Sequence, residues 1–360
     1  MPRSGESHDR DVQQDTRKEK EQPVLRVGLI GVGDTAGWRA RALRAAGLTI
    51  TAVSSRPESQ RVEAFAERHG IPRTFAGWRE MLRSPELFDA IAIATWPDGT
   101  PEVLAAAIDL GLPILVEKPV GWSSASIAEL IAMGHPRVLV GYNRRFYRSV
   151  QEARLEARQG PPALAHLSLP IDVVTPDEPT EDIEYMWPFY ESVSALGLDL
   201  TRFVLGDLHV ESVQHLRNPA GNLAGIAALL TTERGDVLQL SSAWSAAANY
   251  ALTLDWPGRR CALAPFEMLS VYEGMEVHLP TAEYPIRRYL PKLVRQVVLD
   301  GIDLEEKPGF VAEARALRDL MEGREASEHA ARLEDALAVT TLCEELTGVT
   351  LGASRTGAMR

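Results

Sequence analysis

The sequence is poor in cysteine, in long apolar runs and in positive charge, and each shortage excludes a class of protein. Two cysteines among 360 residues, Cys261 and Cys343, exclude a disulfide framework and a cysteine-rich metal site, and they favour a reducing, cytoplasmic location. No segment approaches the roughly 18 apolar residues of a membrane span. An excess of 50 acidic over 38 basic residues gives a net charge of -12, so nucleic acid is a poor partner.

The patterns of several other functional sites are missing as well. Eight histidines are scattered without metal-ligand spacing, so we expect no metal site. No G-x-S-x-G segment and no Cys/His pair indicates acyl transfer. What remains is an ordinary globular composition, 45% hydrophobic and 24% charged, and a length that suits two domains of about 150 residues each.

The first part of the chain alternates between strand-like and helix-like patterns. Residues 1–22 are almost devoid of apolar side chains, so we expect a disordered leader and no secretory signal. The expected strands are 24–30, 48–54, 89–94, 113–117 and 137–142, and the expected helices are 36–46, 57–69, 78–83, 101–110 and 123–133. This alternation predicts an α/β domain over residues 23–143 with a doubly wound parallel sheet of the Rossmann type.

From about residue 163 the pattern changes to short strands separated by turn residues. The expected strands are 163–174, 208–216, 226–233, 237–244, 250–256 and 261–264, and the expected helices are 192–205, 287–301, 309–322 and 331–346. Residues 144–348 are therefore predicted to form an α+β domain with an open, mainly antiparallel sheet, for substrate binding and oligomerisation. Residues 349–360 are predicted to form a flexible tail.

A glycine-rich loop, Gly31-Val32-Gly33-Asp34-Thr35-Ala36, joins the first expected strand to the first helix. Gly31 permits a tight turn, Gly33 lets the backbone approach a pyrophosphate, and Ala36 allows close packing of helix on strand. A purely structural turn would also use glycine. The position of this loop at a strand–helix junction favours dinucleotide binding.

The second strand ends in Ser55-Arg56, and no carboxylate follows before Glu58. A carboxylate at this place would hold the ribose 2′-hydroxyl of NAD, whereas an arginine accommodates the 2′-phosphate of NADP. We therefore expect NADP to be preferred, with NAD as an alternative cofactor. The other interpretation is that Arg56 is a solvated charge on the loop.

Glu117-Lys118-Pro119 follows the strand at 113–117. Ligands of open parallel sheets bind beyond the carboxyl ends of the strands, so Lys118 is expected to point into the crevice. Its ammonium would stabilise negative charge on a substrate oxygen or donate a proton, and Pro119 is compatible with a cis peptide bond. A solvated strand end is the alternative reading of the Glu-Lys pair.

These motifs, together with Gly141-Tyr142-Asn143-Arg144-Arg145-Phe146, resemble the Gfo/Idh/MocA family of glucose–fructose oxidoreductase and inositol dehydrogenase, from residue 24 to about 321. The resemblance implies NAD(P)-dependent oxidation or reduction of sugars, cyclitols or related polyols. It also implies cofactor contacts by Gly31, Gly33, Asp34, Thr35, Ala36, Ser55, Arg56, Ala94, Thr95, Trp96, Pro97, Glu117, Lys118, Asn143 and Arg144. Lys307-Pro308-Gly309-Phe310 is interpreted as a helix entry, in which Gly309 turns and Phe310 packs.

One departure from the family pattern concerns proton transfer. Many members carry Asp-x-x-x-His-x-x-Asp on the helix over the nicotinamide, but alignment on Asp199 places Ser192 and Leu196 at the other two positions. We expect Tyr190 to replace the histidine beside Lys118, although Tyr190 packing under the helix is an equal alternative. The predicted substrate contacts are Lys118, Arg145, Tyr185, Trp187, Ser192 and Asp199, and Asp199 is also a candidate structural acceptor.

The sequence thus predicts an NADP-preferring oxidoreductase that moves hydride to or from a sugar-like hydroxyl or keto carbon. Two alternatives remain: a cofactor-binding sensor or partner subunit that has lost catalysis, and an oxidoreductase for a less polar ketone or an imine. The family resemblance also implies a homodimer or homotetramer, formed through the exposed face of the antiparallel sheet. Left in water, a face of that size would be an unusually large apolar patch.

Overall fold

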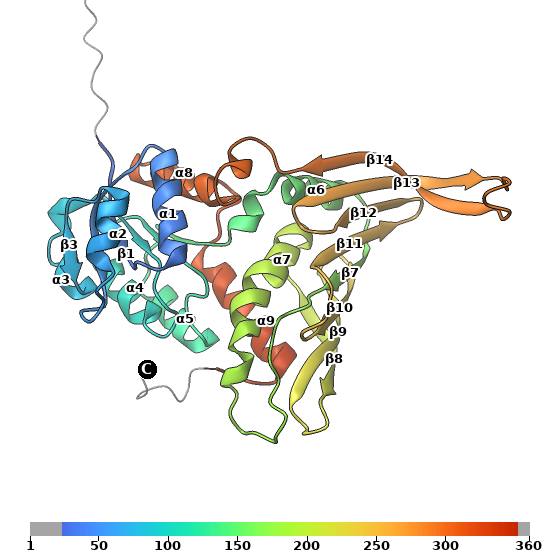
Figure 1. Ribbon diagram of the computed structural model, residues 1–360, viewed down its shortest axis with the longest axis horizontal. Helices are drawn as coiled ribbons and strands as arrows, with labels where there is room; N and C mark the ends of the chain where they lie inside the picture. Colours follow the sequence, from blue (N-terminus) through green and yellow to red (C-terminus); the bar gives the residue numbers. More distant parts are fainter. Residues whose placement is uncertain (1–23, 352–360) are drawn as a thin grey trace, which may run out of the picture.

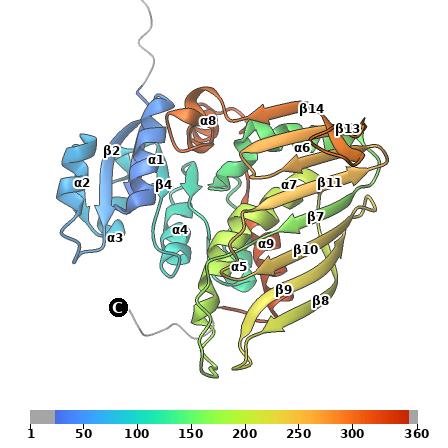
Figure 2. The same cartoon turned by 45° about the vertical axis from the view of Figure 1, so that its right-hand side comes forward.

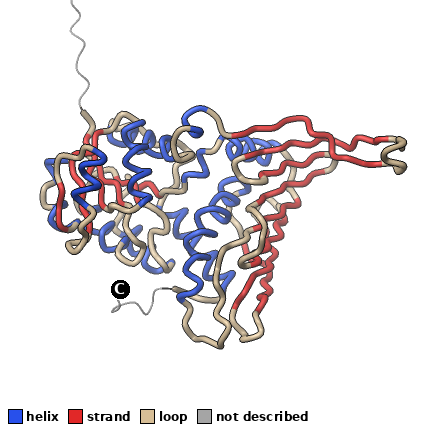
Figure 3. The backbone as a smooth tube through the Cα atoms, viewed as in Figure 1, coloured by secondary structure: helices blue, strands red, loops and turns tan. Residues whose placement is uncertain are grey.

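The computed structural model describes residues 24–351, which form an N-terminal part around a parallel sheet and a C-terminal part around a larger sheet (Figure 1). The predicted leader lies outside the described residues, as does the end of the predicted tail from residue 352 on. In Figure 3 the strands gather into two separate sheets, with helices between them. None of the helices in residues 24–351 has the length and apolar character that crossing a bilayer requires.

The N-terminal sheet has six parallel strands in the order β3-β2-β1-β4-β5-β6. These strands are β1 (Arg26–Ile30), β2 (Thr49–Ser55), β3 (Thr74–Ala76), β4 (Ala90–Ile93), β5 (Ile114–Val116) and β6 (Val138–Val140). The helices are α1 (Asp34–Ala45), α2 (Val62–His69), α3 (Trp78–Leu82), α4 (Thr100–Ile108) and α5 (Ser124–Ala132). Strands β4, β5 and β6 are buried along their whole length, as expected for a sheet covered on both faces. The predicted Rossmann fold is confirmed.

The C-terminal sheet has eight strands in the order β14-β13-β12-β11-β7-β10-β9-β8. These strands are β7 (Leu164–Ser168), β8 (His209–Arg217), β9 (Leu223–Thr231), β10 (Val237–Ala243), β11 (Ala251–Trp256), β12 (Arg259–Leu263), β13 (Met268–His278) and β14 (Arg288–Val298). Every neighbouring pair is antiparallel except β7 with β10. The predicted open, mainly antiparallel sheet is confirmed.

The prediction of a helix at 287–301 is wrong, because this segment is strand β14. It pairs with β13, a strand that the sequence did not indicate. Apolar side chains at positions 290, 293, 294, 297 and 298 have helical spacing, but pairing with β13 decides the conformation. Register shifts between Val271 and Met275 break the alternation of β13 that would have identified it. The hairpin projects beyond the rest of the molecule (Figure 1).

Helices pack on one face of the large sheet, and the other face carries no helix of the described chain. Helices α6 (Arg148–Gln159) and α9 (Leu333–Thr347) contact strands of this sheet, and α7 (Asp199–Leu205) packs on α6. Figure 2 turns the uncovered face of the sheet toward the viewer.

Two domain boundaries differ from the contiguous ranges expected. Helix α8 (Phe310–Met321), within predicted domain 144–348, packs on α1 and buries Phe310 and Leu317 in the core of the N-terminal part. The predicted tail does not begin at residue 349, because Leu351 is buried and Val349 accepts a hydrogen bond from the core.

The expected helix at 192–205 is built of two helix types. A π-helix, η4 (Phe189–Leu198), precedes α7. A π-helix carries hydrogen bonds from residue i to i+5, so side chains in η4 do not follow the spacing of 3.6 residues per turn. Alignment of this segment by α-helical spacing therefore does not predict which of its side chains share a face with Asp199.

Candidate functional site

The glycine loop between β1 and α1 has the shape that the motif predicts. Gly31 has φ +116, and a Cβ there would lie 2.1 Å from the carbonyl oxygen of Ala94. A Cβ at Gly33 would meet nothing within 4 Å, so there is open space before the helix. Gly33 is the N-cap of α1 and supplies no side-chain cap, which leaves the first amides of the helix available to an anion. The loop therefore fits a dinucleotide pyrophosphate.

Three further segments meet this loop at the same edge of the sheet. β1 pairs with β2 and β4, and β4 pairs with β5. Because these strands are parallel, Ser55-Arg56, the Ala94–Pro97 loop and Glu117-Lys118 all follow carboxyl ends beside the glycine loop. Ser55 Oγ donates to the carbonyl of Arg56 at 3.2 Å, and Arg56 is exposed at the tip.

An aromatic cluster stands beside the loop after β4. The rings of Trp96 and Trp187 are 5.5 Å apart in an edge-to-face arrangement, and those of Trp187 and Trp122 are 6.5 Å apart. Trp122 Nε1 donates to Asp98 Oδ1 at 2.7 Å, which anchors the far end of the cluster to the same loop. Trp96 is exposed, so one indole face of the cluster remains open to a ligand. Trp122 was not among the residues predicted for the site.

Lys118 is partly exposed, and its partner comes from the C-terminal part of the chain. Its Nζ lies 3.8 Å from Oε1 of Glu191, at the start of η4. The Lys118-Pro119 peptide bond is cis. A carboxylate and an ammonium at this distance, both in contact with solvent, can exchange protons with a group bound beside them.

The neighbouring Glu117 is buried in an ion cluster. Arg39 of α1 binds Glu117 through Nε at 3.1 Å and through Nη2, and it binds Glu313 of α8 through Nη1 at 2.8 Å. Burial raises the pKa of Glu313 to about 8, and the nearby Glu117 charge acts in the same direction, against the effect of Arg39. A Cβ at Gly141 would lie 3.0 Å from Glu117 Oε2, so the GYNRRF segment packs closely on this cluster.

Lys307 is a residue of the site that the motif reading missed. Its Nζ lies 4.0 Å from the ring centroid of Trp38 on α1. Burial, followed by the charges of Arg144 and Lys118, lowers the pKa of Lys307. The helix-entry role predicted for this segment is confirmed: Gly309 has φ +77 and Phe310 is buried, under the guanidinium of Arg39. The sequence has only five lysines, and this scarcity is the signal that could have drawn attention to Lys307.

Arg144 and Asn143 lie on η2 (Asn143–Phe146), which follows the last parallel strand. Arg144 Nη1 is buried and has no hydrogen-bond partner among the described residues, and Nη2 lies 3.8 Å from Glu267 Oε1. Asn143 Nδ2 donates to the carbonyl of Pro308 at 2.7 Å, which ties η2 to the Lys307 segment. The unpaired donor of Arg144 fits a bound polar or anionic group.

The structure contradicts the catalytic role predicted for Tyr190. Its side chain is buried, and its hydroxyl donates to the carbonyl of Val349 and lies 3.0 Å from Thr347 Oγ1. Burial raises the pKa of Tyr190 above its ordinary value, the opposite of the lowering that a proton donor beside a lysine requires. Tyr190 packs under the helix, and Glu191 is the residue of η4 that lies beside Lys118.

Arg145 and Asp199, both predicted as substrate contacts, neutralise each other inside the protein. Arg145 Nε donates to Asp199 Oδ2 at 2.8 Å and Nη2 to Oδ1 at 2.5 Å, and Nη2 also lies 2.9 Å from Asp335 Oδ1. Asp199 is 1% exposed and Arg145 is 5% exposed. The structural role considered for Asp199 is the one observed.

The remaining predicted residues are placed as follows. The Tyr185 hydroxyl accepts from the backbone N–H of Leu223 at 3.1 Å, so it is engaged in the C-terminal sheet. Leu196 is half-buried against the hydrophobic core. Ser192 falls among residues 192–195, whose side chains the structure does not describe. Within residues 24–351, no group of three or more histidine, cysteine, aspartate or glutamate side chains is placed to hold a metal ion.

Comparison with known proteins agrees with the motifs. Residues 25–137 match the GFO_IDH_MocA family model, described as an oxidoreductase family with an NAD-binding Rossmann fold, and the resemblance predicted from the sequence is confirmed. The chain is 33% identical over 153 residues to inositol 2-dehydrogenase 1 of Saccharopolyspora erythraea, covering 40% of this chain and 45% of that protein. It is 29% identical over 149 residues to 1,5-anhydro-D-fructose reductase of Ensifer adhaerens, covering 39% and 44%. The aligned segment spans less than half of either relative.

Solved structures share the fold of both parts of the chain. Levoglucosan dehydrogenase in complex with NADH and L-sorbose superimposes with a TM-score of 0.70 at 14% identity, covering 91% of this chain and 96% of that one. UDP-N-acetylglucosamine 3-dehydrogenase of Acidithiobacillus ferrooxidans superimposes with a TM-score of 0.67 at 18% identity, covering 90% and 97%. At these identities the likeness establishes the architecture.

The raised pKa of Glu313 predicts an unusual pH dependence of stability. The unfolded chain ionises this carboxyl near 4.5 and the folded chain near 8, so its contribution to stability falls as the pH rises through this range. Glu313→Gln removes the titration. We expect the free energy of unfolding of the variant, relative to the wild type, to improve by on the order of 2 kcal/mol between pH 5 and pH 8.

Urea unfolding at the two pH values measures this difference. Glu129→Gln, at an exposed position of α5, is the matched control for loss of one carboxylate. If the free energies of unfolding of the wild type and E313Q differ by the same amount at both pH values, Glu313 is ionised in the folded protein at both.

Proposed function

We propose that this chain is an NAD(P)-dependent oxidoreductase that transfers hydride to or from a sugar, cyclitol or related hydroxy or keto substrate. The observation that carries the proposal is the convergence of the glycine loop, Lys118 and Glu191 at one edge of the parallel sheet. The relatives with similar sequence act, by their names, on inositol and 1,5-anhydro-D-fructose, which supports a substrate of this class.

The cofactor would be held by backbone and side chains that the structure leaves available. The amides at the start of α1 would bind the pyrophosphate, and the loops carrying Ser55, Ala94 to Pro97 and Glu117 would line the rest. Arg144, with its unpaired Nη1, would approach the nicotinamide end from η2. When bound, nicotinamide supplies the hydride chemistry, and the protein supplies position and polarity.

Lys118 and Glu191 would act on the substrate hydroxyl, whose proton is lost or gained together with hydride transfer. The ammonium of Lys118 would stabilise negative charge as it develops on the substrate oxygen. Glu191, 3.8 Å from Nζ, would accept or return the proton, in the place that a histidine takes in many family members. Trp96 and Trp187 would pack against the apolar face of a sugar-like ring.

NADP is the preferred cofactor in this proposal, with NAD as an alternative. Arg56 is exposed at the end of β2 and makes no ion pair with any described residue, so its guanidinium is available to a 2′-phosphate. The neighbouring position is Ser55, which adds a hydroxyl and no negative charge.

The chain is also proposed to form a homodimer or homotetramer in the cytoplasm. Exposed apolar side chains gather on the β13–β14 hairpin: Met275, Val277, Leu279, Tyr284, Ile286, Tyr289, Leu290, Leu293, Val294 and Val298. A second copy seated on the hairpin and the uncovered sheet face would bury them. The two cysteines are free and buried, which suits a reducing compartment.

Lys118→Ala is expected to lower kcat on the correct substrate by about a thousandfold, because the developing oxygen charge loses its partner. Glu191→Gln is expected to lower kcat by about a hundredfold and to remove one limb of the pH profile, as proton transfer is lost. The measurement is a steady-state assay over hydroxy and keto sugars at several pH values. Fluorescence titration with NADPH checks that the dissociation constant changes less than about threefold.

Lys118→Met is the companion variant, because it keeps the length of the side chain without its charge, and it should match the alanine variant. Unchanged turnover in these variants would refute the roles of the two residues. Tight NADPH binding with no hydride transfer to any substrate would favour a sensor or partner subunit.

Arg56→Ala is expected to weaken NADPH binding about tenfold and to leave NADH binding within about twofold, because only NADPH carries the 2′-phosphate. Fluorescence titrations of the wild type and the variant with both cofactors make the comparison, with NADH as the internal control. Equal losses for the two cofactors would assign Arg56 to a shared part of the dinucleotide and end the argument for NADP preference.

Leu290→Glu together with Leu293→Glu is expected to convert the proposed oligomer largely to monomer, since it places two charges in the apolar contact. Light scattering after size-exclusion chromatography measures the mass. Leu155→Glu, at an equally exposed leucine on α6, is the control and should keep the wild-type mass. A monomeric wild type, or a double variant with unchanged mass, would exclude the hairpin as the interface.

A further inference from the structure

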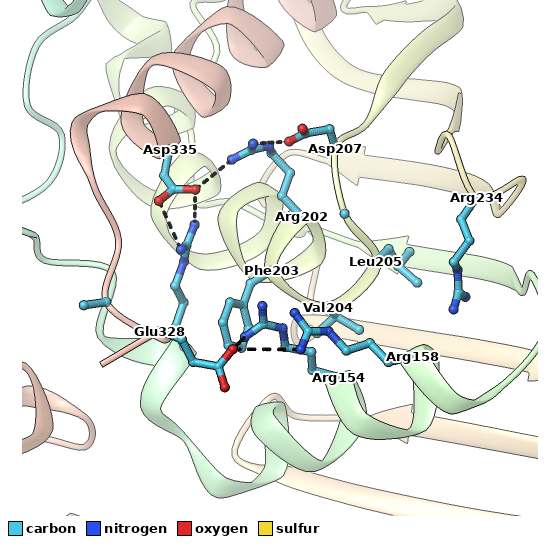
Figure 4. A pocket seen from close by; sticks show the side chains of 13 residues that line it. Arg154, Arg158, Arg202, Phe203, Val204, Leu205, Asp207, Arg234, Glu328 and Asp335 are labelled. Atoms are coloured by element: carbon cyan, nitrogen blue, oxygen red, sulfur yellow. Dashed lines mark hydrogen bonds and ion pairs between the residues drawn. The ribbon is translucent and has the colours of Figure 1, made fainter. Parts of the chain in front are cut away.

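A pocket that Arg145 helps to line shares no residue with the glycine loop or with Lys118. It encloses about 390 Å³ between α6, α7 and the segment that leads into α9 (Figure 4). Five of its lining residues are arginines, namely Arg145, Arg154, Arg158, Arg202 and Arg234. This concentration of positive charge contrasts with the overall charge of -12.

Three of these arginines have close carboxylate partners. Arg145 is paired with Asp199 and Asp335, Arg202 with Asp207 and Asp335, and Arg234 with Asp236. Their charges are balanced inside the protein. These three arginines therefore line the pocket without adding net charge to it. The two remaining arginines are Arg154 and Arg158.

Arg154 and Arg158 share one distant carboxylate. Glu328 lies 3.8 Å from Arg154 Nη1 and 3.9 Å from Arg158 Nη1, which is too long for a hydrogen bond, and its side chain is 69% exposed. Figure 4 shows Glu328 reaching toward both guanidinium groups from the rim. Arg154 Nε is buried and has no hydrogen-bond partner among the described residues. The two guanidinium groups therefore share a single carboxylate, which leaves one positive charge without a counter-charge.

The two guanidinium groups are held in place by the fold. Arg154 and Arg158 are one turn apart on α6, so they face the same side. The guanidinium of Arg154 lies over the ring of Phe203, 4.0 Å from its centroid. Burial, followed by the charge of Arg158, lowers the pKa of Arg154, which reflects the positive potential of the pocket. A stacked arginine loses little conformational freedom when it binds an anion.

We propose that this pocket binds a phosphate group, either as inorganic phosphate or as part of a small phosphorylated metabolite. Two guanidinium groups on one side match a tetrahedral dianion, which can accept hydrogen bonds from both. A single carboxylate ligand would only replace the charge that Glu328 already supplies. A volume of about 390 Å³ exceeds the needs of phosphate alone and leaves room for a compound of sugar size.

Isothermal titration of the full-length protein with inorganic phosphate at constant ionic strength tests this site. Arg158→Gln, at a half-exposed position, is expected to weaken phosphate binding roughly tenfold. Glu328→Gln is expected to tighten it about threefold, because the competing carboxylate is removed. Arg148→Gln is the matched control, since Arg148 lies on the same helix, is exposed and pairs with Asp300 outside the pocket.

Phosphate could also bind at the glycine loop, and the variants distinguish the two places. Binding that R158Q and E328Q leave unchanged belongs to the glycine loop and overturns the proposal, as does the absence of measurable binding by the wild type. Opposite shifts in R158Q and E328Q, with R148Q at the wild-type value, support the pocket. A repeat with a sugar phosphate shows whether the extra volume adds affinity, and equal affinities assign the site to inorganic phosphate.

Discussion

The proposed redox site depends on one buried guanidinium, that of Arg39. A charged group in the interior is strongly unfavourable unless its partners are also present, so Arg39 requires Glu117 to balance its charge and Glu313 to accept its remaining hydrogen bond. These partners come from the segment after β5 and from α8, which are nearly 200 residues apart in the chain. The same contact that neutralises Arg39 therefore holds α8 on α1, fixes the strand end that carries Lys118, and brings Lys307 beside it.

A second buried guanidinium, that of Arg145, joins separate elements in the C-terminal part in the same way. Arg145 joins η2 to Asp199 on α7 and to Asp335 on α9. Its neighbour Arg144 has the opposite character, with a buried donor that no described residue satisfies. The guanidinium of Arg145 is thus satisfied by carboxylates of the protein, whereas Arg144 keeps a donor for the ligand proposed above.

Charge is distributed so that anions are attracted locally and not to the protein as a whole. The chain is acidic overall, yet Lys118, Arg144 and Lys307 influence one another in the crevice, and Arg154 and Arg158 face one pocket. Such local clusters, enclosed by protein of low dielectric constant, act on a bound ligand more strongly than the distant surface charge does.

Local sequence determined the Rossmann domain, the glycine loop, the strand end at Lys118 and the helix entry at Gly309, because in each case the backbone requirement and the apolar pattern lie within a few residues. Tertiary structure decided the rest. Strand β14 has apolar spacing that suits a helix, and only its pairing with β13 makes it a strand. That Glu191 and not Tyr190 lies beside Lys118 depends on the π-helix η4 and on the packing of Val349, whose carbonyl accepts the hydrogen bond of the Tyr190 hydroxyl. These outcomes rest on contacts between residues distant in the sequence, whose energies no local pattern contains.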